Sequence, residues 1–582
     1  MSTQQQTGFH RTFYVANFME ILERLAWYGM YTLLALYLTS PMSQGGLSLS
    51  QTEKGLIMGV VPFFLYLFPI VSGALADRYG YRRMFIASFI IMAPCYYLLG
   101  HMKDMWSFMA VFMLVALGAG IFKPVVIGTI GRTTNAENRG LGFGIFYMMV
   151  NIGGALGPLI APIIQKKFGW EGVFSFAALW ISLNFIPVLL FYKEPVTEKS
   201  AKTLKQVFNE MQLVLGNARL ALLVFPMLIL IVAYNANLVP EFSSLSAGAF
   251  TIVIAVAMLL LSLFWDIYNT RISNKTPMEM RPWYAQVMRI GNKPFMVYLL
   301  IMSGFWTVYL QLFITLPSYI RDFVDTGDLV AILQTLGPWF YETFAAIDSQ
   351  ALISELLRLS QLVNENNANL SEIARNAIQS LDVRVPAQEV NTALAAIAAS
   401  PELAQEYAMK WSTEYRQMNP STLLGLDFIM IVFFQILISH LIKNYKVLPT
   451  LIAGTLLVSL GLWLGSLAHG LILGGGLIAT SIIVFATGEM IASPKSQEYV
   501  ASFAPKDQVA LFMGYYFVAM ALGNLFGGIL SGWLYDTFAI GMQSPEFMWT
   551  VIALLGVATC CALFIFHRTM SAEITKQQLA VA

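Results

Sequence analysis

Charged side chains are scarce in this chain of 582 residues. Only 12% of its residues are Asp, Glu, Lys or Arg, and 34 basic against 33 acidic residues leave a net charge of +1. This balance lacks the basic surplus typical of nucleic-acid binding, so we expect no nucleic-acid partner. Hydrophobic residues make up 57% of the chain, and the mean hydropathy is +0.66. This composition excludes an ordinary soluble domain and predicts a polytopic protein of the lipid bilayer.

Cysteine is also nearly absent. Cys95, Cys560 and Cys561 all fall in apolar stretches, so the sequence predicts neither a disulfide framework nor a metal motif. It shows no glycine-rich nucleotide-binding loop, and we expect no enzyme activity, no metal and no bound cofactor. No cleavable signal peptide is visible, because the polar residues 1–7 lead straight into an apolar stretch without a small-residue cleavage pattern.

The few charges inside apolar stretches are the most informative residues. The stretch 13–38 is long enough to span a bilayer as a helix, yet it contains Glu20, Glu23 and Arg24. Each such charge costs roughly 2.5–3.5 kcal/mol at mid-depth. Spacings of three and four residues place all three on one helix face, which must point into the protein or a wet cavity. This face is either a salt bridge that only joins helices or a proton or substrate site.

Two more ionisable residues, Lys123 and Glu489, stand within apolar stretches, and each has a proline nearby. A buried charge needs a partner, and Glu20 or Glu23 is the natural partner of Lys123. A carboxylate–lysine pair of this kind can exchange charge for a proton, which is what coupling to a proton gradient requires. The alternatives are that Lys123 snorkels to the membrane interface and that Glu489 only bonds another helix.

A glycine-containing turn rich in arginine follows the second apolar stretch, 56–76. Arginines beside a span favour the cytoplasmic side of the membrane. The turn resembles the loop signature between helices 2 and 3 of the major facilitator superfamily, and a basic turn with no further role is the alternative. Its key residues are Gly73, Asp77, Arg78 and Arg82.

These motifs together resemble the proton-dependent oligopeptide transporter family of the major facilitator superfamily. The resemblance is carried by Glu-x-x-Glu-Arg at 20–24, Lys-Pro at 123–124, Phe-Tyr-x-x-x-Asn-x-Gly at 146–153 and Gly-Glu-x-x-x-Ser-Pro at 488–494. It implies an all-α fold of twelve core transmembrane helices in two six-helix halves, with an extra two-helix hairpin between them. It also implies symport of di- and tripeptides, or of a peptide-like amine-bearing small molecule, by alternating access, with protons as the coupling ion.

The resemblance also assigns roles to individual residues. It implies proton coupling by Glu20, Glu23, Arg24 and Lys123, amine binding by Asn151, Asn419 and Glu489, and a pocket lined by Tyr28 and Tyr66.

Two positions depart from the family pattern together. Tyr31 replaces an Arg that receives the peptide carboxylate, and Leu310 replaces a Glu that pairs with that Arg. Loss of one partner would strand a buried charge at a cost of about 3–5 kcal/mol, whereas loss of both avoids that cost. We therefore expect a substrate site that keeps its amine end and has a neutral carboxylate end.

Three further charged residues are unusual for the family. Lys495 and Glu498 are three residues apart on a predicted helix, so they are either a pair at the cytoplasmic gate or a solvated pair. Asp427 either adds an acid to the cavity or lies at the membrane edge.

The hydrophobic pattern divides the chain into segments. We expect an N-terminal bundle at 1–192, linkers and the extra hairpin at 193–293, helix 7 at 294–320 (its apolar run at 295–320), a helical insertion at 321–419, the rest of the C-terminal bundle at 420–567 and a tail at 568–582. The linkers are basic, which favours the cytoplasm: Lys193, Lys199, Lys202, Lys205, Arg271, Lys275, Arg281, Arg289 and Lys293. Lys166 and Lys167 fall on the opposite side as a small exception.

The insertion at 321–419 has thirteen acidic and six basic residues and follows an odd-numbered helix. We therefore expect it outside the cytoplasm, as a passive spacer or as a module that binds a protein partner. With both termini in the cytoplasm, the expected location is a bacterial inner membrane. The alternatives to a symporter are a transporter-fold receptor or assembly factor that acts through the insertion, and a proton-driven exporter.

Overall fold

The computed structural model describes residues 9–135, 138–194, 204–236, 238, 247–272, 282–363, 369–503 and 509–581. Within these ranges the chain is helical, and β structure is limited to two isolated bridges. The expected all-α fold is confirmed. Of the basic linker residues, Lys199, Lys202, Lys275 and Arg281 lie outside the described ranges.

The N-terminal half contains six helices in chain order. They are α1 (Arg11–Thr39), α2 (Gln51–Tyr79), α3 (Tyr81–Leu99), α4 (Met105–Arg132), α5 (Arg139–Leu183) and α6 (Phe185–Leu190), with the short η1 (Met42–Gln44) after α1. Within α5, Gly169 has a φ of 68°, in the left-handed region that favours glycine, so the chain bends there. The two parts of α5 on either side of Gly169 therefore form separate spans.

The C-terminal half is interrupted by the insertion. It comprises α10 (Lys293–Tyr309), α11 (Gln311–Ile314), α12 (Leu316–Phe323), α19 (Pro420–Ile442), α20 (Val447–Ser466), α21 (Gly474–Phe503), α22 (Val509–Leu534), the π-helix η4 (Tyr535–Gly541) and α23 (Pro545–Val581). The apolar run 295–320 thus forms three consecutive helices that break at Leu310 and Thr315. Pro317, in the first turn of α12, explains the second break because proline has no backbone N–H to donate to the preceding turn. The expected tail at 568–582 continues as helix to Val581.

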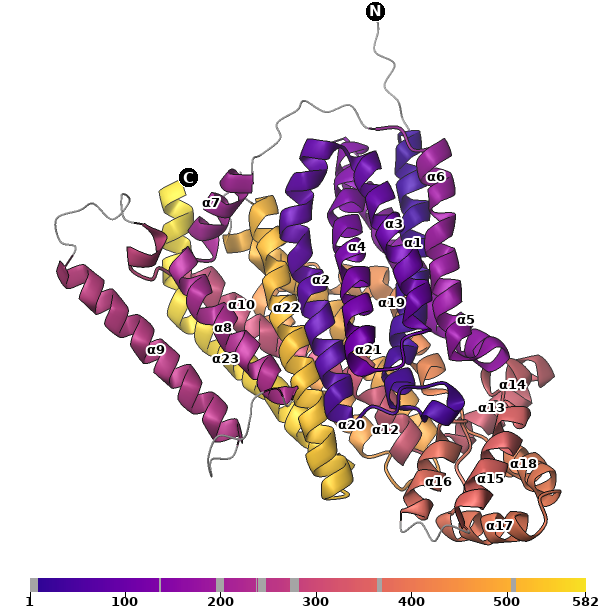
Figure 1. Ribbon diagram of the computed structural model, residues 1–582. Helices are drawn as coiled ribbons and strands as arrows, with labels where there is room; N and C mark the ends of the chain where they lie inside the picture. The colour runs from indigo at the N-terminus through magenta and orange to yellow at the C-terminus, as the bar shows by residue number, and fades with distance from the viewer. Residues whose placement is uncertain are drawn as a thin grey trace, which may run out of the picture.

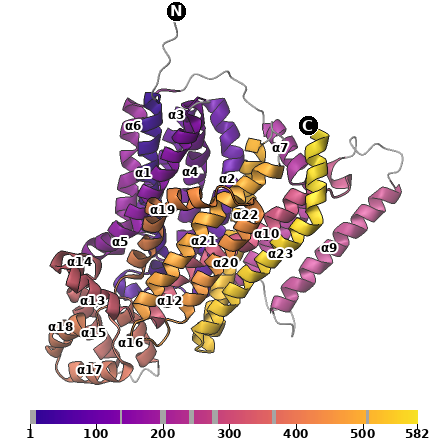
Figure 2. The same ribbon diagram turned by 180° about the vertical axis from the view of Figure 1, so that it is seen from behind.

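Two helices stand beside these halves. The extra hairpin consists of α8 (Ala218–Asn235) and α9 (Ala247–Ile272). Both views show α9 at the edge of the molecule, and Figure 1 shows it beyond α8 (Figures 1 and 2). The linkers add α7 (Leu204–Val214) and η3 (Trp283–Ala285). Twelve segments of the described chain, the hairpin included, are long and apolar enough to span a membrane. When α5 is divided at Gly169 and the charged α1 is added, the two halves have twelve spans, as expected.

The two halves meet along α2 with α22 and along α5 with α19. Gly55 on α2 and Gly528 on α22 pack backbone to backbone, since a Cβ on either would collide with the carbonyl oxygen of the other. In a second contact between the halves, the hydroxyl of Ser421 on α19 donates to the carbonyl of Thr32 on α1 at 2.8 Å. These contacts hold the halves together at the end that carries the insertion.

The insertion is a small helical domain with its own core. Its helices are α13 (Gly327–Leu336), α14 (Pro338–Phe344), α15 (Ser349–Val363), α16 (Leu370–Gln379), α17 (Ala387–Ala399) and α18 (Leu403–Glu414). Leucine, alanine and valine side chains of α15 to α18 form a buried cluster around Trp411, separate from the transmembrane core. Figure 1 shows this domain at the end of the molecule opposite the start of α1 and the end of α23.

Candidate functional site

The charged cluster on α1 is buried in the N-terminal half. Glu20, Glu23 and Arg24 are each at most 5% exposed. The Arg24 Nε lies 3.3 Å from the Glu20 Oε1, and the Arg24 guanidinium also pairs with Glu23. One oxygen of each carboxylate has no hydrogen-bond partner among the described residues. One guanidinium thus faces two carboxylates, and the cluster keeps a surplus negative charge that a proton can neutralise.

Lys123 on α4 is not the direct partner of these carboxylates, and the expected pairing needs correction. No carboxylate oxygen of the described residues lies within 4.0 Å of its ammonium, which instead lies 4.7 Å from the centre of the Tyr66 ring. Arg24 takes the carboxylates because it lies one and four residues from them on the same helix, and its planar guanidinium can bind both. The charge of Lys123 still interacts with Glu20 and Glu23 across the gap.

Glu489 on α21 lies in a second buried cluster, in the C-terminal half. The hydroxyl of Tyr309 on α10 donates to the Glu489 Oε1 at 2.9 Å. Asp427 on α19 is fully buried, and its carboxyl group lies within hydrogen-bonding range of the Glu489 carboxyl. Of the two expectations for Asp427, the structure supports an acid in the protein interior. Sequence reasoning missed Tyr309, whose one available signal was its place immediately before the unusual Leu310.

Tyr28 on α1 packs between the α1 cluster and α19 of the other half. Its ring lies 5.8 Å from the Arg24 guanidinium on one side and 4.7 Å from the Phe428 ring on the other, and Phe428 directly follows Asp427. Tyr66 on α2 similarly stacks on Phe517 of α22, with 6.1 Å between ring centres. Both tyrosines that the resemblance placed in the pocket therefore contact aromatic residues of the other half.

The two departures from the family pattern also lie in this region. Tyr31 stacks on Trp27 at 5.2 Å and faces Phe313 of α11 across the interface between the halves. Leu310 is buried at the break between α10 and α11. Both positions are neutral and packed in apolar surroundings, so the double replacement leaves no stranded charge.

The two asparagines that the resemblance assigned to amine binding lie in different places. Asn151 is buried on α5, where its amide donates to the carbonyl of Tyr147 at 2.8 Å. Asn419 is the N-cap of α19 and donates to Asp382 of the insertion at 3.1 Å. Asn419 is therefore not brought together with Glu489. Asp427, eight residues after Asn419 and about 12 Å further along the helix axis, lies beside Glu489 instead.

The arginine-rich turn joins α2, α3, α4 and α6. Asp77 forms an ion pair of 2.6 Å with Arg132 at the end of α4. It also accepts a hydrogen bond of 3.0 Å from the Tyr81 hydroxyl. Arg82 donates to the carbonyls of residues 188 and 189 at the end of α6. Arg78 lies over the Tyr79 ring, and a Cβ added at Gly73 would just reach Pro124 of α4. The turn thus fixes one end of the N-terminal half.

Lys495 and Glu498 form the predicted pair on α21. Their charged atoms are 2.8 Å apart, and Lys495 is buried whereas half of the Glu498 side chain is exposed. The pair lies toward the end of α21 remote from the insertion, because the start of that helix contacts Asp328 of the insertion. Its role in gating stays a prediction.

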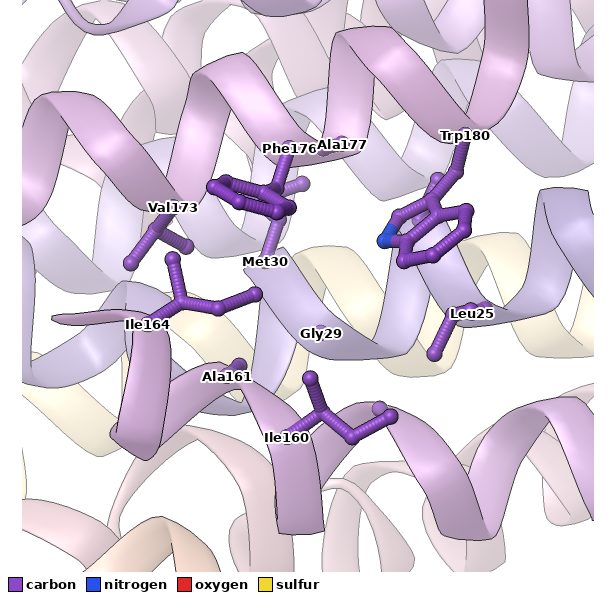
Figure 3. A pocket seen from close by; sticks show the side chains of 12 residues that line it. Leu25, Gly29, Met30, Ile160, Ala161, Ile164, Val173, Phe176, Ala177 and Trp180 are labelled. Carbon is purple, nitrogen blue, oxygen red and sulfur yellow. The ribbon is translucent and has the colours of Figure 1, made fainter. Parts of the chain in front are cut away.

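Figure 3 shows a cavity beside the α1 cluster, between α1 and the two parts of α5. Its volume of about 10 Å³ is roughly what one water molecule needs. The lining is apolar and includes Leu25, Gly29, Ile160 and Trp180. Apart from the indole N–H of Trp180, its lining side chains have no polar group to orient a ligand, so this cavity is a packing gap and not a substrate site.

The fold and the two buried clusters define a polytopic membrane protein with ionisable residues gathered where two helical halves meet. The profile of the Major Facilitator Superfamily matches residues 17–279 and 390–579, which is more than half of the chain. The chain therefore belongs to this superfamily.

Comparison with known proteins confirms the resemblance that the motifs predicted. The chain is 30% identical over 213 residues to an uncharacterized transporter, YclF, of Bacillus subtilis, a match covering 33% of this chain and 42% of that protein. It is 29% identical over 221 residues to the peptide transporter YePEPT of Yersinia enterocolitica, covering 34% and 42% of the two chains. The matches thus span less than half the length of these relatives.

Solved structures show the same fold along the whole chain. A crystal structure of peptide transporter POT in complex with sulfate aligns with a TM-score of 0.61 at 17% identity, over 99% of this chain and 97% of that one. A POT family transporter in complex with 5-aminolevulinic acid aligns with a TM-score of 0.60 at 18% identity, over 99% of both chains. The expected major facilitator fold is confirmed.

Proposed function

We propose that this protein is a proton-coupled symporter of di- and tripeptides, or of a peptide-like amine-bearing small molecule, that works by alternating access. The observation that carries the proposal is the presence of a buried ionisable cluster in each half, with Tyr28 of the N-terminal half packed against both Arg24 and Phe428 of α19. Buried charges at the interface of two transporter halves are typical of coupling-ion and substrate sites. The similarity to a peptide transporter of Yersinia enterocolitica supports the substrate class.

The α1 cluster and Lys123 form the proposed proton site. Protonation of Glu20 or Glu23 removes the surplus negative charge that Arg24 leaves uncompensated. The attraction on the Lys123 ammonium then weakens, and the ammonium rests on the Tyr66 ring, which itself contacts the other half. Proton binding in the N-terminal half is thereby transmitted to the surface where the two halves separate.

The Glu489 cluster is the proposed substrate site, and Glu489 with Tyr309 supplies the acceptor for the substrate amine. Tyr31 and Leu310 are buried and neutral, so neither supplies a cation for a substrate carboxylate. We therefore infer that a C-amidated dipeptide competes with the free dipeptide. A marked preference for the free carboxylate in an uptake competition assay would contradict this inference.

Proton-driven uptake into proteoliposomes tests the function itself. With an imposed inward proton gradient, the wild-type protein accumulates a labelled dipeptide, and Lys123→Ala abolishes the accumulation. Lys103→Ala is the matched control, because that lysine is a solvent-exposed residue of the loop before α4. If an intact wild-type protein shows no uptake, the proposal fails and a receptor or assembly role through the insertion is favoured.

The charge distribution supports the proposed orientation. The arginine-rich turn lies at the end of the N-terminal half where α2 ends, and the acidic insertion lies at the other end (Figure 2). Basic residues beside spans favour the cytoplasm, so both termini lie in the cytoplasm and the insertion lies outside. The extra hairpin favours a bacterial inner membrane as the location of the protein. Protease protection of tags at each terminus and in the insertion tests the orientation.

A further inference from the structure

Exposed apolar side chains of the insertion gather on its first two helices, α13 and α14. Four large side chains there are between 39% and 64% exposed: Ile332, Leu336, Trp339 and Phe340. Among the described residues of α15 to α18, Met409 is the one large apolar side chain with comparable exposure. The segment 329–341 has no charged residue, although the insertion as a whole is acidic. The exposed surface of α13 and α14 therefore differs in chemistry from the rest of the insertion.

The two helices already share a small core that does not include these four side chains. Its members are buried or partly buried apolar residues: Val330, Leu333 and Ala345, with Tyr341 and Phe344 packed against them. The rings of Trp339 and Phe340 lie 5.0 Å apart and remain exposed. α13 thus has apolar side chains on its buried side and on its exposed side. A helix with this distribution is typical of a position in lipid or in a protein core and not of one surrounded by water.

The exposed apolar surface lies at the end of the transmembrane helices. Asp328 at the start of α13 accepts a hydrogen bond of 2.7 Å from the backbone N–H of Gly476, in the first turn of the span α21. The loop before α21 is apolar as well, and its residues 471–473 are between 47% and 85% exposed. Both views show α13 and α14 between the end of α5 and the helices α15 and α17 (Figures 1 and 2). They therefore lie at the level where spans enter the headgroup region of a bilayer.

Lipid matches this surface in chemistry and in position. Aromatic side chains, Trp above all, are enriched at the membrane interface, because the ring is apolar and the indole N–H can still bond to water or headgroups. A helix with Trp, Phe and Leu on one face buries that face at the boundary between headgroups and acyl chains. The surface has no charge that could select a charged protein partner or an anionic headgroup. Its continuity with the start of α21 favours the lipid that already surrounds the spans.

We propose that Ile332, Leu336, Trp339 and Phe340 insert into the lipid leaflet on the insertion's side of the membrane. α13 and α14 then lie in the interfacial region of that leaflet and anchor the insertion to it. Helices α15 to α18 have their own core around Trp411 and few exposed apolar side chains, so they stay in water. The inference goes beyond the proposed function, because it concerns the insertion alone and holds whatever the chain transports.

Fluorescence quenching of a label on this surface tests the lipid contact. In the full-length protein the native cysteines are replaced by alanine, and nitrobenzoxadiazole is attached to Trp339→Cys or, as the matched control, to the equally exposed Met409→Cys on α18. The protein is placed in phosphatidylcholine nanodiscs, which leave both faces open to solvent. We expect a lipid that is spin-labelled near the top of its acyl chain to quench the label at 339 at least about threefold more than the label at 409. Iodide in the solvent should quench the two labels in the opposite order.

Three results would overturn the proposal. Equal iodide quenching at 339 and 409 would show that the surface faces water. Protection of the label at 339 from both iodide and the spin-labelled lipid would show that protein, such as a second copy of this chain, covers the surface. Loss of lipid quenching at high salt would show a contact made by charges, because salt screens charges and not apolar burial. If Trp339→Cys does not fold, Ile332→Cys reports on the same surface from α13.

Discussion

Lys166 on α5 and Asp382 in the insertion form a buried ion pair of 2.6 Å. The same Asp382 carboxylate accepts a hydrogen bond from Asn419, the N-cap of α19. One side chain of the insertion therefore links the N-terminal half to the C-terminal half. The pair also explains why a lysine stands on the acidic side of the membrane, where the distribution of basic residues alone left it as an exception.

Removal of Lys166 tests whether this link holds the halves together. In Lys166→Ala the Asp382 carboxylate is left largely buried without its cation, and loss of one partner of a buried pair costs up to about 3–5 kcal/mol. We expect hydrogen exchange in α16 and around residue 382 to become at least about tenfold faster, which corresponds to about 1.4 kcal/mol. The adjacent Lys167 is exposed, so Lys167→Ala is the matched control. Equal rates of hydrogen exchange in the two variants would show that the Lys166–Asp382 pair does not stabilise the contact between the insertion and α5.

The glycine contact between α2 and α22 predicts a steric effect at the interface between the halves. A Cβ at Gly528 collides with the backbone of Gly55, so Gly528→Ala forces the two helices apart. Overpacking of this kind typically costs about 1–3 kcal/mol, and we expect a lower unfolding temperature in detergent. Gly514→Ala on the same helix meets open space and serves as the control. Similar unfolding temperatures for the two variants would refute the close contact.

The insertion contains a pH-sensitive contact outside the membrane. Hydrogen bonds from Lys410, Tyr415 and Trp411 lower the pKa of the Glu389 carboxyl to about 2. Because the pKa is lower in the folded state than the ordinary 4.5, the contact stabilises the insertion fully above pH 4.5. The stabilisation is lost as the pH falls from 4.5 toward 2.

We expect hydrogen exchange in α17 and α18 to accelerate over that pH range in the wild-type protein, after correction for the intrinsic rate. Glu389→Gln exchanges faster already at pH 7 and loses most of the additional acid sensitivity. Glu406→Gln, an exposed acid on α18, keeps the wild-type profile. A Glu389→Gln protein with the wild-type profile would exclude this carboxylate as the origin.

The helices and the shared face of the α1 charges were predictable because they depend on local patterns. An apolar run of transmembrane length defines a span, and spacings of three and four residues bring Glu20, Glu23 and Arg24 together on any helix. The pairing of Lys495 with Glu498 was predictable for the same reason. The insertion was recognisable as helical from its periodicity. Its location outside the cytoplasm stays a prediction.

The remaining features depend on how deep each residue lies in the membrane and on contacts between segments that are distant in the sequence. The sequence did not determine that Arg24 would take both carboxylates and leave Lys123 on the Tyr66 ring, because that choice depends on the distance between α1 and α4. The placement of Asp427 beside Glu489 depends on where α19 begins. Since α19 begins at Pro420, the Asn-Pro motif lies at the end of the helix and not beside the buried acids.

Asn419 therefore provides a test of the structure against the family resemblance. Its side chain caps α19 by accepting from the Ser421 N–H at 3.0 Å and donates to Asp382, whereas the resemblance assigns it to the substrate amine. Asn419→Ala should lower the free energy of unfolding by about 1 kcal/mol, as loss of an N-cap typically does, and leave the KM for dipeptide uptake unchanged.

Two further variants make this prediction decisive. Asn419→Asp keeps a good N-cap but loses the donor to Asp382 and places two carboxylates together, so we expect it to loosen the insertion without restoring the contact. Asn151→Ala removes the buried amide on α5 and should raise the KM, because that residue lies on the helix that faces the acidic pair. If Asn419→Ala instead raises the KM as much as Asn151→Ala and unfolds like the wild type, Asn419 contacts the substrate and its position at the insertion is wrong.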